Sequence, residues 1–221
     1  MVKTSFPTPS TTETRVKASP SRQLLHDLIV GGLGFAAVSL AAFAVWAFGG
    51  RWFESHGGEA TMYAACTVVF FGASGLLLHP LVRGSAKLWR FYRIFIPAYC
   101  VYALVWCGAW FTFHFGFGEW LGSLLGSLSL AYLIAWGVGS YRAFPKVSLV
   151  LFLTHSAGYF LGGMLMGWML QHGNGGGGFG HHSPLPKLAW GLLYGLGLGA
   201  GLGYAFYTFQ SASPQLPIGD S

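Results

Sequence analysis

The sequence predicts an all-α integral membrane protein, a bundle of six transmembrane helices with both termini in the cytoplasm. Three observations predict this fold class: the composition, six long apolar segments and the placement of the basic residues. Of the 221 residues, 53% are hydrophobic and only 8% are charged. A soluble domain carries about 25% charged residues. A surface with so little charge suits a lipid bilayer as its main partner and excludes an ordinary soluble domain.

Six apolar segments are each long enough to cross the hydrocarbon layer, which takes about 20 helical residues. They lie near residues 25–48, 61–82, 92–113, 120–140, 147–170 and 187–209. We expect each to be helical, because a lone strand leaves its backbone polar groups unsatisfied in lipid. The third and fourth segments run together in hydropathy, and Gly116, Gly118 and Glu119 place the break between them.

The basic residues predict the orientation. Ten of the twelve Lys and Arg residues precede the first segment, or lie between the second and third or the fourth and fifth; only Arg51 and Lys187 fall elsewhere. The positive-inside rule then puts both termini and both basic connections in the cytoplasm. This placement also explains the net charge of +6 without a nucleic-acid partner. The membrane we expect is the inner (plasma) membrane of a bacterium.

The chain divides into a membrane domain and two tails. Twelve of residues 1–22 are Ser, Thr or Pro and four are Lys or Arg, too little apolar surface to fold. We therefore expect a disordered cytoplasmic tail at 1–22, a six-helix transmembrane domain at 23–210 and a short cytoplasmic tail at 211–221.

Glycines recur four residues apart in the last three segments. They form the sets Gly191, Gly195, Gly199 and Gly203; Gly122 and Gly126; Gly158 and Gly162; and Gly163 and Gly167. Residues four apart share a helix face, and a glycine face lets a neighbouring backbone approach closely in a membrane. These faces predict helix packing within the chain. The alternatives are a homo-oligomer or docking into a larger membrane complex.

The segment 92–113 carries one aromatic face. Its members recur at spacings of three and four: Tyr92, Phe95, Tyr99, Tyr102, Trp106, Trp110 and Phe113. We predict that Tyr99, Tyr102, Trp106 and Trp110 bind a flat or greasy ligand, although packing or lipid contact would also use such a face. Pro97 lies within this segment and predicts a kink.

The histidines suggest a second kind of site. His79 and His155 lie in or near membrane segments, where an ionisable residue is a functional candidate, and they could hold haem b or a metal. His56, His114 and His172 lie with His181 and His182 in the predicted outer loops, where imidazoles could bind zinc or copper. The alternatives are a buried histidine bonded to Ser, Thr or a backbone carbonyl, and loop histidines without a ligand.

Several function classes lack their signatures. No Asp, Glu or Lys lies deep in a predicted span, which argues against an ion-driven transporter. The sequence has no phosphate-binding loop, dinucleotide fingerprint or HExxH motif, so no enzyme class is indicated. The leading hypothesis is a membrane protein that binds a small or lipophilic molecule or lets it pass. The alternatives are a haem- or metal-binding redox protein and an accessory subunit of a larger complex.

Overall fold

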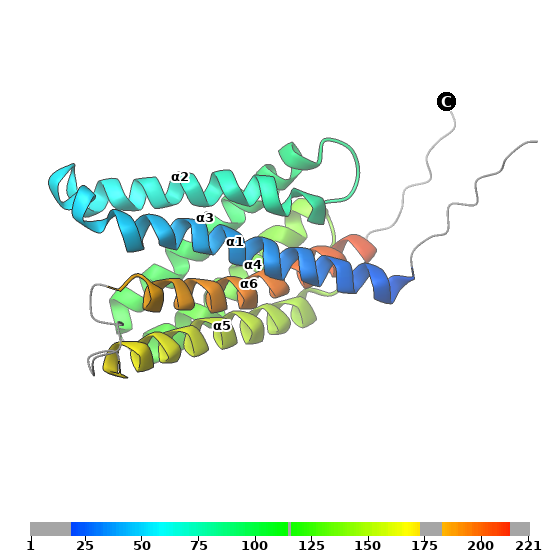
Figure 1. The fold of residues 1–221 in the computed structure, drawn as a ribbon. Helices are drawn as coiled ribbons and strands as arrows, with labels where there is room; N and C mark the ends of the chain where they lie inside the picture. Colours follow the sequence, from blue (N-terminus) through cyan, green and yellow to red (C-terminus); the bar gives the residue numbers. More distant parts are fainter. Residues whose placement is uncertain (1–18, 115, 173–182, 213–221) are drawn as a thin grey trace, which may run out of the picture.

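The computed structural model describes residues 19–114, 116–172 and 183–212, and within them the chain is entirely helical (Figure 1). The elements are α1 (Pro20–Ser55), α2 (Gly58–Leu78), the 3-10 helix η1 (His79–Leu81), α3 (Lys87–Phe113), α4 (Phe117–Val138), α5 (Phe144–His172) and α6 (Leu185–Ala212). Six of these helices are long and apolar enough to cross a membrane. The all-helical class is confirmed, and the architecture is that of a multi-pass membrane protein. Most of the predicted tails at 1–22 and 211–221, namely residues 1–18 and 213–221, and the pair His181 and His182 lie outside the described residues.

Local signals explain where the helices begin and end. Ser19 caps α1, since its hydroxyl accepts a hydrogen bond from the Arg22 backbone N–H (3.4 Å), and Pro20 occupies the first turn; both choices favour a helix start. α1 therefore begins within the stretch expected to be a tail. Between α3 and α4 the backbone turns at Gly116, whose φ of 74° suits glycine. The break thus falls at Gly116, as the sequence predicts, whereas Gly118 and Glu119 already belong to α4. α3 itself runs unbroken through Pro97.

α6 lies between α1 and α5 and contacts each through glycines (Figure 1). A Cβ added at Gly199 would overlap the backbone carbonyl of Gly31 in α1. On another side of α6, Gly197 lies against the backbone of Thr154 and Gly158 in α5. Two faces of one helix are therefore held against two neighbours at backbone distance.

α1 and α2 form one helical hairpin, and α3 and α4 form another. α2 packs on α1, and α4 packs on α3, whereas α2 and α3 contact each other at few positions. Two glycines of α4 act as seats for aromatic rings of α3, because Gly122 lies against Trp106 and Gly126 against Tyr102. The weak contact between α2 and α3 leaves room between the hairpins for the cavities described below.

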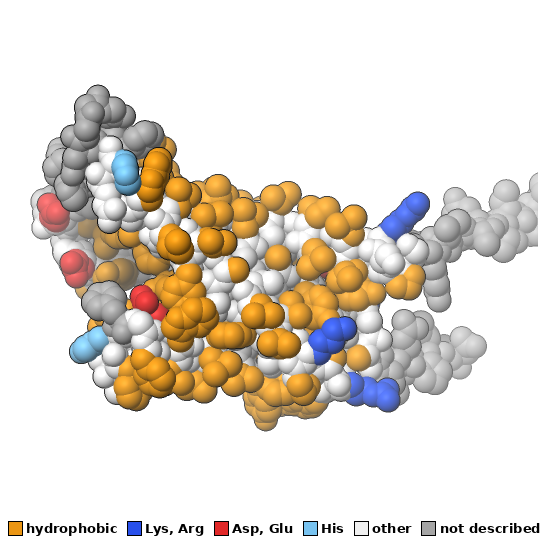
Figure 2. Space-filling view, turned by 90° about the horizontal axis from the view of Figure 1, so that it is seen from below, with side chains coloured by type: hydrophobic (Ala, Val, Ile, Leu, Met, Phe, Trp, Pro, Cys, Tyr) orange, Lys and Arg blue, Asp and Glu red, His pale blue; other side chains and the backbone are white. Residues whose placement is uncertain are grey.

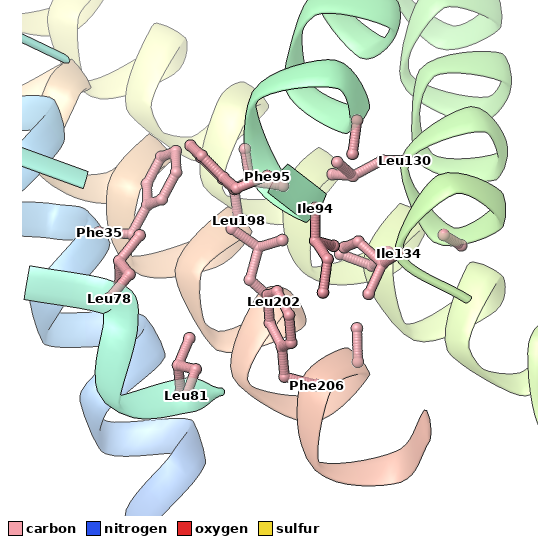
Figure 3. Close-up of a cluster of buried hydrophobic side chains, with 14 of the residues drawn as sticks. Phe35, Leu78, Leu81, Ile94, Phe95, Leu130, Ile134, Leu198, Leu202 and Phe206 are labelled. Atoms are coloured by element: carbon pink, nitrogen blue, oxygen red, sulfur yellow. The ribbon is translucent and has the colours of Figure 1, made fainter. Parts of the chain in front are cut away.

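One hydrophobic core joins the helices toward the end of the bundle where α1 begins and α6 ends (Figure 3). In that view, Leu202 and Phe206 of α6 lie between residues of α1, α2 and η1 on one side and residues of α4 on the other. Aromatic rings of α3 complete this core, with the centroids of Phe91 and Phe95 4.8 Å apart.

Polar contacts tie the same end together. Asp27 of α1 is only 2% exposed, and its carboxylate lies 3.6 Å from the Arg83 guanidinium and 3.0 Å from His26 Nδ1. The Arg83 backbone N–H donates to the Gln210 side chain (2.8 Å). The connection from α2 to α3 is therefore fixed to both α1 and α6.

Charge separates along the bundle. Figure 2 shows Lys and Arg side chains at one end, Asp, Glu and His side chains at the other, and a broad hydrophobic band between them. We call these the basic end, where α1 begins and α6 ends, and the acidic end, which carries Glu54, Glu59 and Glu119. Lys187 is an exception, a cation at the start of α6 on the acidic end.

Candidate functional site

A large cavity occupies the half of the bundle nearer the acidic end. Its volume is about 980 Å³, at the upper end of the roughly 300–1,000 Å³ typical of ligand pockets. Nine of its sixteen lining residues are aromatic, and all six long helices contribute at least one residue. We call it the aromatic cavity. Its size and lining are those of a site for an apolar molecule with flat surfaces.

A smaller cavity of about 510 Å³ adjoins it. The two share Ala42, Phe43 and Cys66 as lining residues, so they are neighbours along α1 and α2. The small cavity reaches further toward the middle of the bundle, where Tyr99 of α3 and Tyr194 of α6 line it. Together the two cavities form an apolar space that α2 borders on one side and α3 on the other.

The structure divides the four predicted ligand residues among three environments. Trp106 and Trp110 line the aromatic cavity, and Tyr99 lines the small cavity. Tyr102 is 4% exposed and lines neither of them. The aromatic face of α3 is therefore shared between two cavities and a buried polar contact, and ligand binding by these residues stays a prediction.

Tyr102 belongs to a buried chain of hydroxyls that ends on a histidine. The hydroxyls of Tyr99 and Tyr194 are 3.2 Å apart, and those of Tyr194 and Tyr102 are also 3.2 Å apart. The Tyr102 hydroxyl is 2.7 Å from His155 Nε2. His155 is fully buried, and its Nδ1 has no hydrogen-bond partner among the described residues. The chain joins α3, α5 and α6, as polar side chains commonly do between membrane helices.

From the sequence we expect His155 to bond Ser, Thr or a backbone carbonyl, or to hold haem or a metal, and Tyr194 is not among the predicted site residues. A signal for Tyr194 exists, since it is the one polar side chain in the glycine-rich stretch 191–203. Nothing local indicates that it meets Tyr99 and Tyr102, because that contact depends on how α6 is rotated against α3.

The aromatic cavity contains one carboxylate, that of Glu119. The Tyr159 hydroxyl donates to Glu119 Oε1 (3.1 Å), and the Gly116 backbone N–H donates to Oε2 at a longer 3.4 Å. The sequence places Glu119 at a loop, but it lies in the first turn of α4, half-buried in the cavity wall. The one local signal for this position is that Glu119 follows Gly116 by three residues, from where a glutamate side chain can reach back to the N-cap N–H.

Two tryptophan rings pack against Tyr159, the partner of that carboxylate. The Tyr159 ring centroid is 5.5 Å from Trp106 and 5.7 Å from Trp190, both at steep interplanar angles. Each tryptophan is seated on a glycine of a neighbouring helix, Trp106 on Gly122 and Trp190 on Gly162. Trp106 is one of the ligand residues that the sequence predicts. Tyr159 and Trp190 are not among them. These seats hold the cavity wall in one arrangement.

The two histidines predicted to hold haem or a metal have different partners. His79 Nδ1 donates to backbone carbonyls in the last turn of α2, those of Gly75 (3.0 Å) and Leu76 (3.1 Å). His155 meets Tyr102 instead. The two lie on different helices and share neither a contact nor a cavity.

The three described histidines that were predicted to lie in outer loops each contact the tryptophan four residues before them. His56 Nδ1 donates to the Trp52 carbonyl (2.8 Å) and His172 Nδ1 to the Trp168 carbonyl (2.9 Å), with stacked rings in both cases. His114 meets Trp110 edge-on, with 6.5 Å between centroids. The sequence carries a signal for this, because tryptophan precedes histidine by four residues at three equally spaced places. Among the described residues, no three His, Cys, Asp or Glu side chains are grouped to hold a metal ion.

Comparison of the chain with family models, with curated proteins and with solved structures found no match in any of the three. We therefore infer the function from the cavities and from the side chains around them.

Proposed function

We propose that this protein crosses a membrane six times and binds a small, lipophilic molecule in the aromatic cavity. The observation that carries the proposal is the cavity itself, about 980 Å³ of space lined mainly by aromatic side chains. Pockets of this size with apolar walls and a few polar groups are the usual sites for small ligands.

The proposal includes an orientation with both termini in the cytoplasm. The basic end carries Arg83, Arg90, Arg142 and Lys146, and cytoplasmic connections are enriched in Lys and Arg. In this orientation the aromatic cavity lies in the outer half of the bilayer. The inner membrane of a bacterium is the location we propose.

The walls favour a ligand with flat, apolar surfaces. Trp106 and Trp190 present ring surfaces held on glycine seats, and aromatic rings add about 0.5–1.5 kcal/mol per pair beyond the area they bury. Entry between α2 and α3 is supported by their sparse contact and by the lining residues that both helices supply, such as Cys66 and Cys107. A ligand dissolved in the bilayer would reach the cavity through that side.

A titration with 1,4-naphthoquinone, which quenches tryptophan fluorescence, tests the proposal on the full chain in a non-ionic detergent. Trp106→Ala removes one wall, which costs about 1.5 kcal/mol or more, so the affinity should fall about tenfold. Trp89→Ala is the matched control, because Trp89 lies on the same helix, is 68% exposed and lines neither cavity. Equal quenching without saturation in all three proteins would contradict the proposal.

The redox alternative stays a prediction. His155 Nε2 already bonds Tyr102, so haem ligation through that nitrogen requires the bond to break. The visible absorption spectrum of the purified protein tests it: a Soret band that disappears in His155→Ala would support haem and displace the proposal above.

Assembly with other chains also stays a prediction. Gly163 and Gly167 of α5 have no atom of another residue near the position of an added Cβ, so that pair is not used for packing within the described chain. Mass measurement of the complex in a mild detergent distinguishes a monomer from a homo-oligomer or a larger assembly.

A further inference from the structure

We propose that the ligand of the aromatic cavity is a lipophilic cation, an amine or quaternary ammonium group attached to an apolar body. This inference rests on the proposed function and adds the charge of the ligand. It starts from Glu119, the one charged side chain among the sixteen residues that line the cavity.

Glu119 brings a negative charge into a wall that is otherwise aromatic, aliphatic or sulfur-containing. Its Oε1 accepts from the Tyr159 hydroxyl, and its Oε2 has only the 3.4 Å contact with the Gly116 N–H. No Lys, Arg or His among the described residues forms an ion pair with it. A carboxylate partly removed from water is stabilised by a cation close to it, and the cavity is the place from which that cation would come.

The rings beside Glu119 suit the same ligand. Tyr159, which donates to the carboxylate, packs edge-on against Trp106 and Trp190. A cation within about 6 Å of a ring centroid is attracted to the ring face, and groups of such rings recognise quaternary ammonium ions. A carboxylate bonded to Tyr159, in a cavity that Trp106 and Trp190 also line, therefore combines the two features that select an organic cation.

Another ring of the wall already takes a cation. The Lys187 Nζ lies 4.4 Å from the centroid of Trp46, a residue that lines the cavity. Lys187 itself is not a lining residue and makes no ion pair with Glu119. Its charge is thus used on Trp46 and leaves the carboxylate to the ligand.

The space beyond the carboxylate fits an apolar body. The small cavity continues from the aromatic cavity past Phe43 and is lined by Phe70, Phe71 and Leu104. A molecule with its cationic group at Glu119 can therefore extend an alkyl or aryl part toward the middle of the bundle.

The experiment compares two probes that differ only in charge. One is 4-phenylbutyl-trimethylammonium, and the other is its neutral analogue with a tert-butyl group in place of the trimethylammonium. Binding of each to the full chain is measured by tryptophan fluorescence in a non-ionic detergent. We expect the wild-type protein to bind the cation about tenfold more tightly than the neutral analogue, the size of one favourable cation–π and ionic contact.

Glu119→Gln should reduce this preference to the part that the aromatic rings contribute, and it should leave the affinity for the neutral probe unchanged, because the amide oxygen still accepts from Tyr159. Glu54→Gln is the matched control, since Glu54 is exposed at the same end and does not line the cavity; it should keep the preference. A second measurement uses the wild-type chain alone: the cationic probe, but not the neutral one, should slow carbodiimide labelling of Glu119.

The outcomes separate the two proposals. Equal affinity of the wild-type protein for both probes would overturn the cation inference and leave the proposed cavity intact. A preference that is undiminished in Glu119→Gln, or labelling of Glu119 that the cation does not slow, would overturn the assignment to Glu119. Saturable binding of neither probe would count against the proposed function itself.

Discussion

Gly199 of α6 faces the backbone of α1, and replacing it with alanine perturbs the closest approach between these two helices. A Cβ at this position would overlap the Gly31 carbonyl and lie 2.6 Å from the Phe35 Cβ. Both obstacles belong to or adjoin the α1 backbone, so no rotation of a flexible side chain relieves them. We expect α1 and α6 to be forced apart locally.

The magnitude follows from a matched substitution. Overpacking of this kind costs about 1–3 kcal/mol, whereas alanine in place of glycine gains up to about 1 kcal/mol of helix propensity. Gly167→Ala in α5 has the same gain, and no atom lies within 4 Å of its added Cβ. Because the propensity gain cancels between the two variants, Gly199→Ala should be less stable than Gly167→Ala by about 1–3 kcal/mol.

Unfolding by sodium dodecyl sulfate in mixed micelles, followed by tryptophan fluorescence, measures the free energy of unfolding of both variants. Size-exclusion chromatography confirms that each begins as a folded, unaggregated species. Equal free energies of unfolding for Gly199→Ala and Gly167→Ala would mean that the close packing of α1 on α6 at Gly199 does not stabilise the fold.

Two further predictions concern buried polar groups. A double-mutant cycle of Tyr102→Phe and His155→Phe should give a coupling free energy of about 0.6 kcal/mol, and no more than about 1.7, by the same unfolding assay; zero coupling would mean that their 2.7 Å contact adds nothing. Arg83→Gln should lower stability by about 1–3 kcal/mol, because it leaves the buried carboxylate of Asp27 without its guanidinium partner. Lys87→Gln, at an exposed position of the same connection, should change the free energy of unfolding little. An equal loss of stability in the two variants would contradict the role of Arg83.

The helices and their breaks follow from local features of the sequence. Hydropathy marks six segments, and Gly116 marks the turn between two of them because its positive φ is accessible to glycine. Composition predicts the first helix to start later than it does. The cap formed by Ser19 and Pro20 lies in a stretch whose composition is typical of a tail. Such caps involve two or three residues and are easily hidden by their surroundings.

The site depends on contacts that no single segment contains. The spacing along 92–113 puts Tyr102 and Trp106 on one face, but it does not say that Tyr102 would meet His155 while Trp106 lines a cavity. That division is set by the rotation of α5 and α6 against α3. The sequence puts Glu119 at the break between two segments, and nothing local indicates that its partner Tyr159 lies on another helix.

Photolabelling shows directly whether the aromatic cavity holds the ligand. A neutral aryl diazirine small enough for the cavity is irradiated with the full chain in bilayers, and labelled positions are identified by mass spectrometry. We expect saturable labelling at lining residues such as Trp106 and Tyr159. Excess unlabelled probe should suppress this labelling. Labelling spread over exposed apolar residues such as Val68 and Leu76, without saturation or competition, would contradict it.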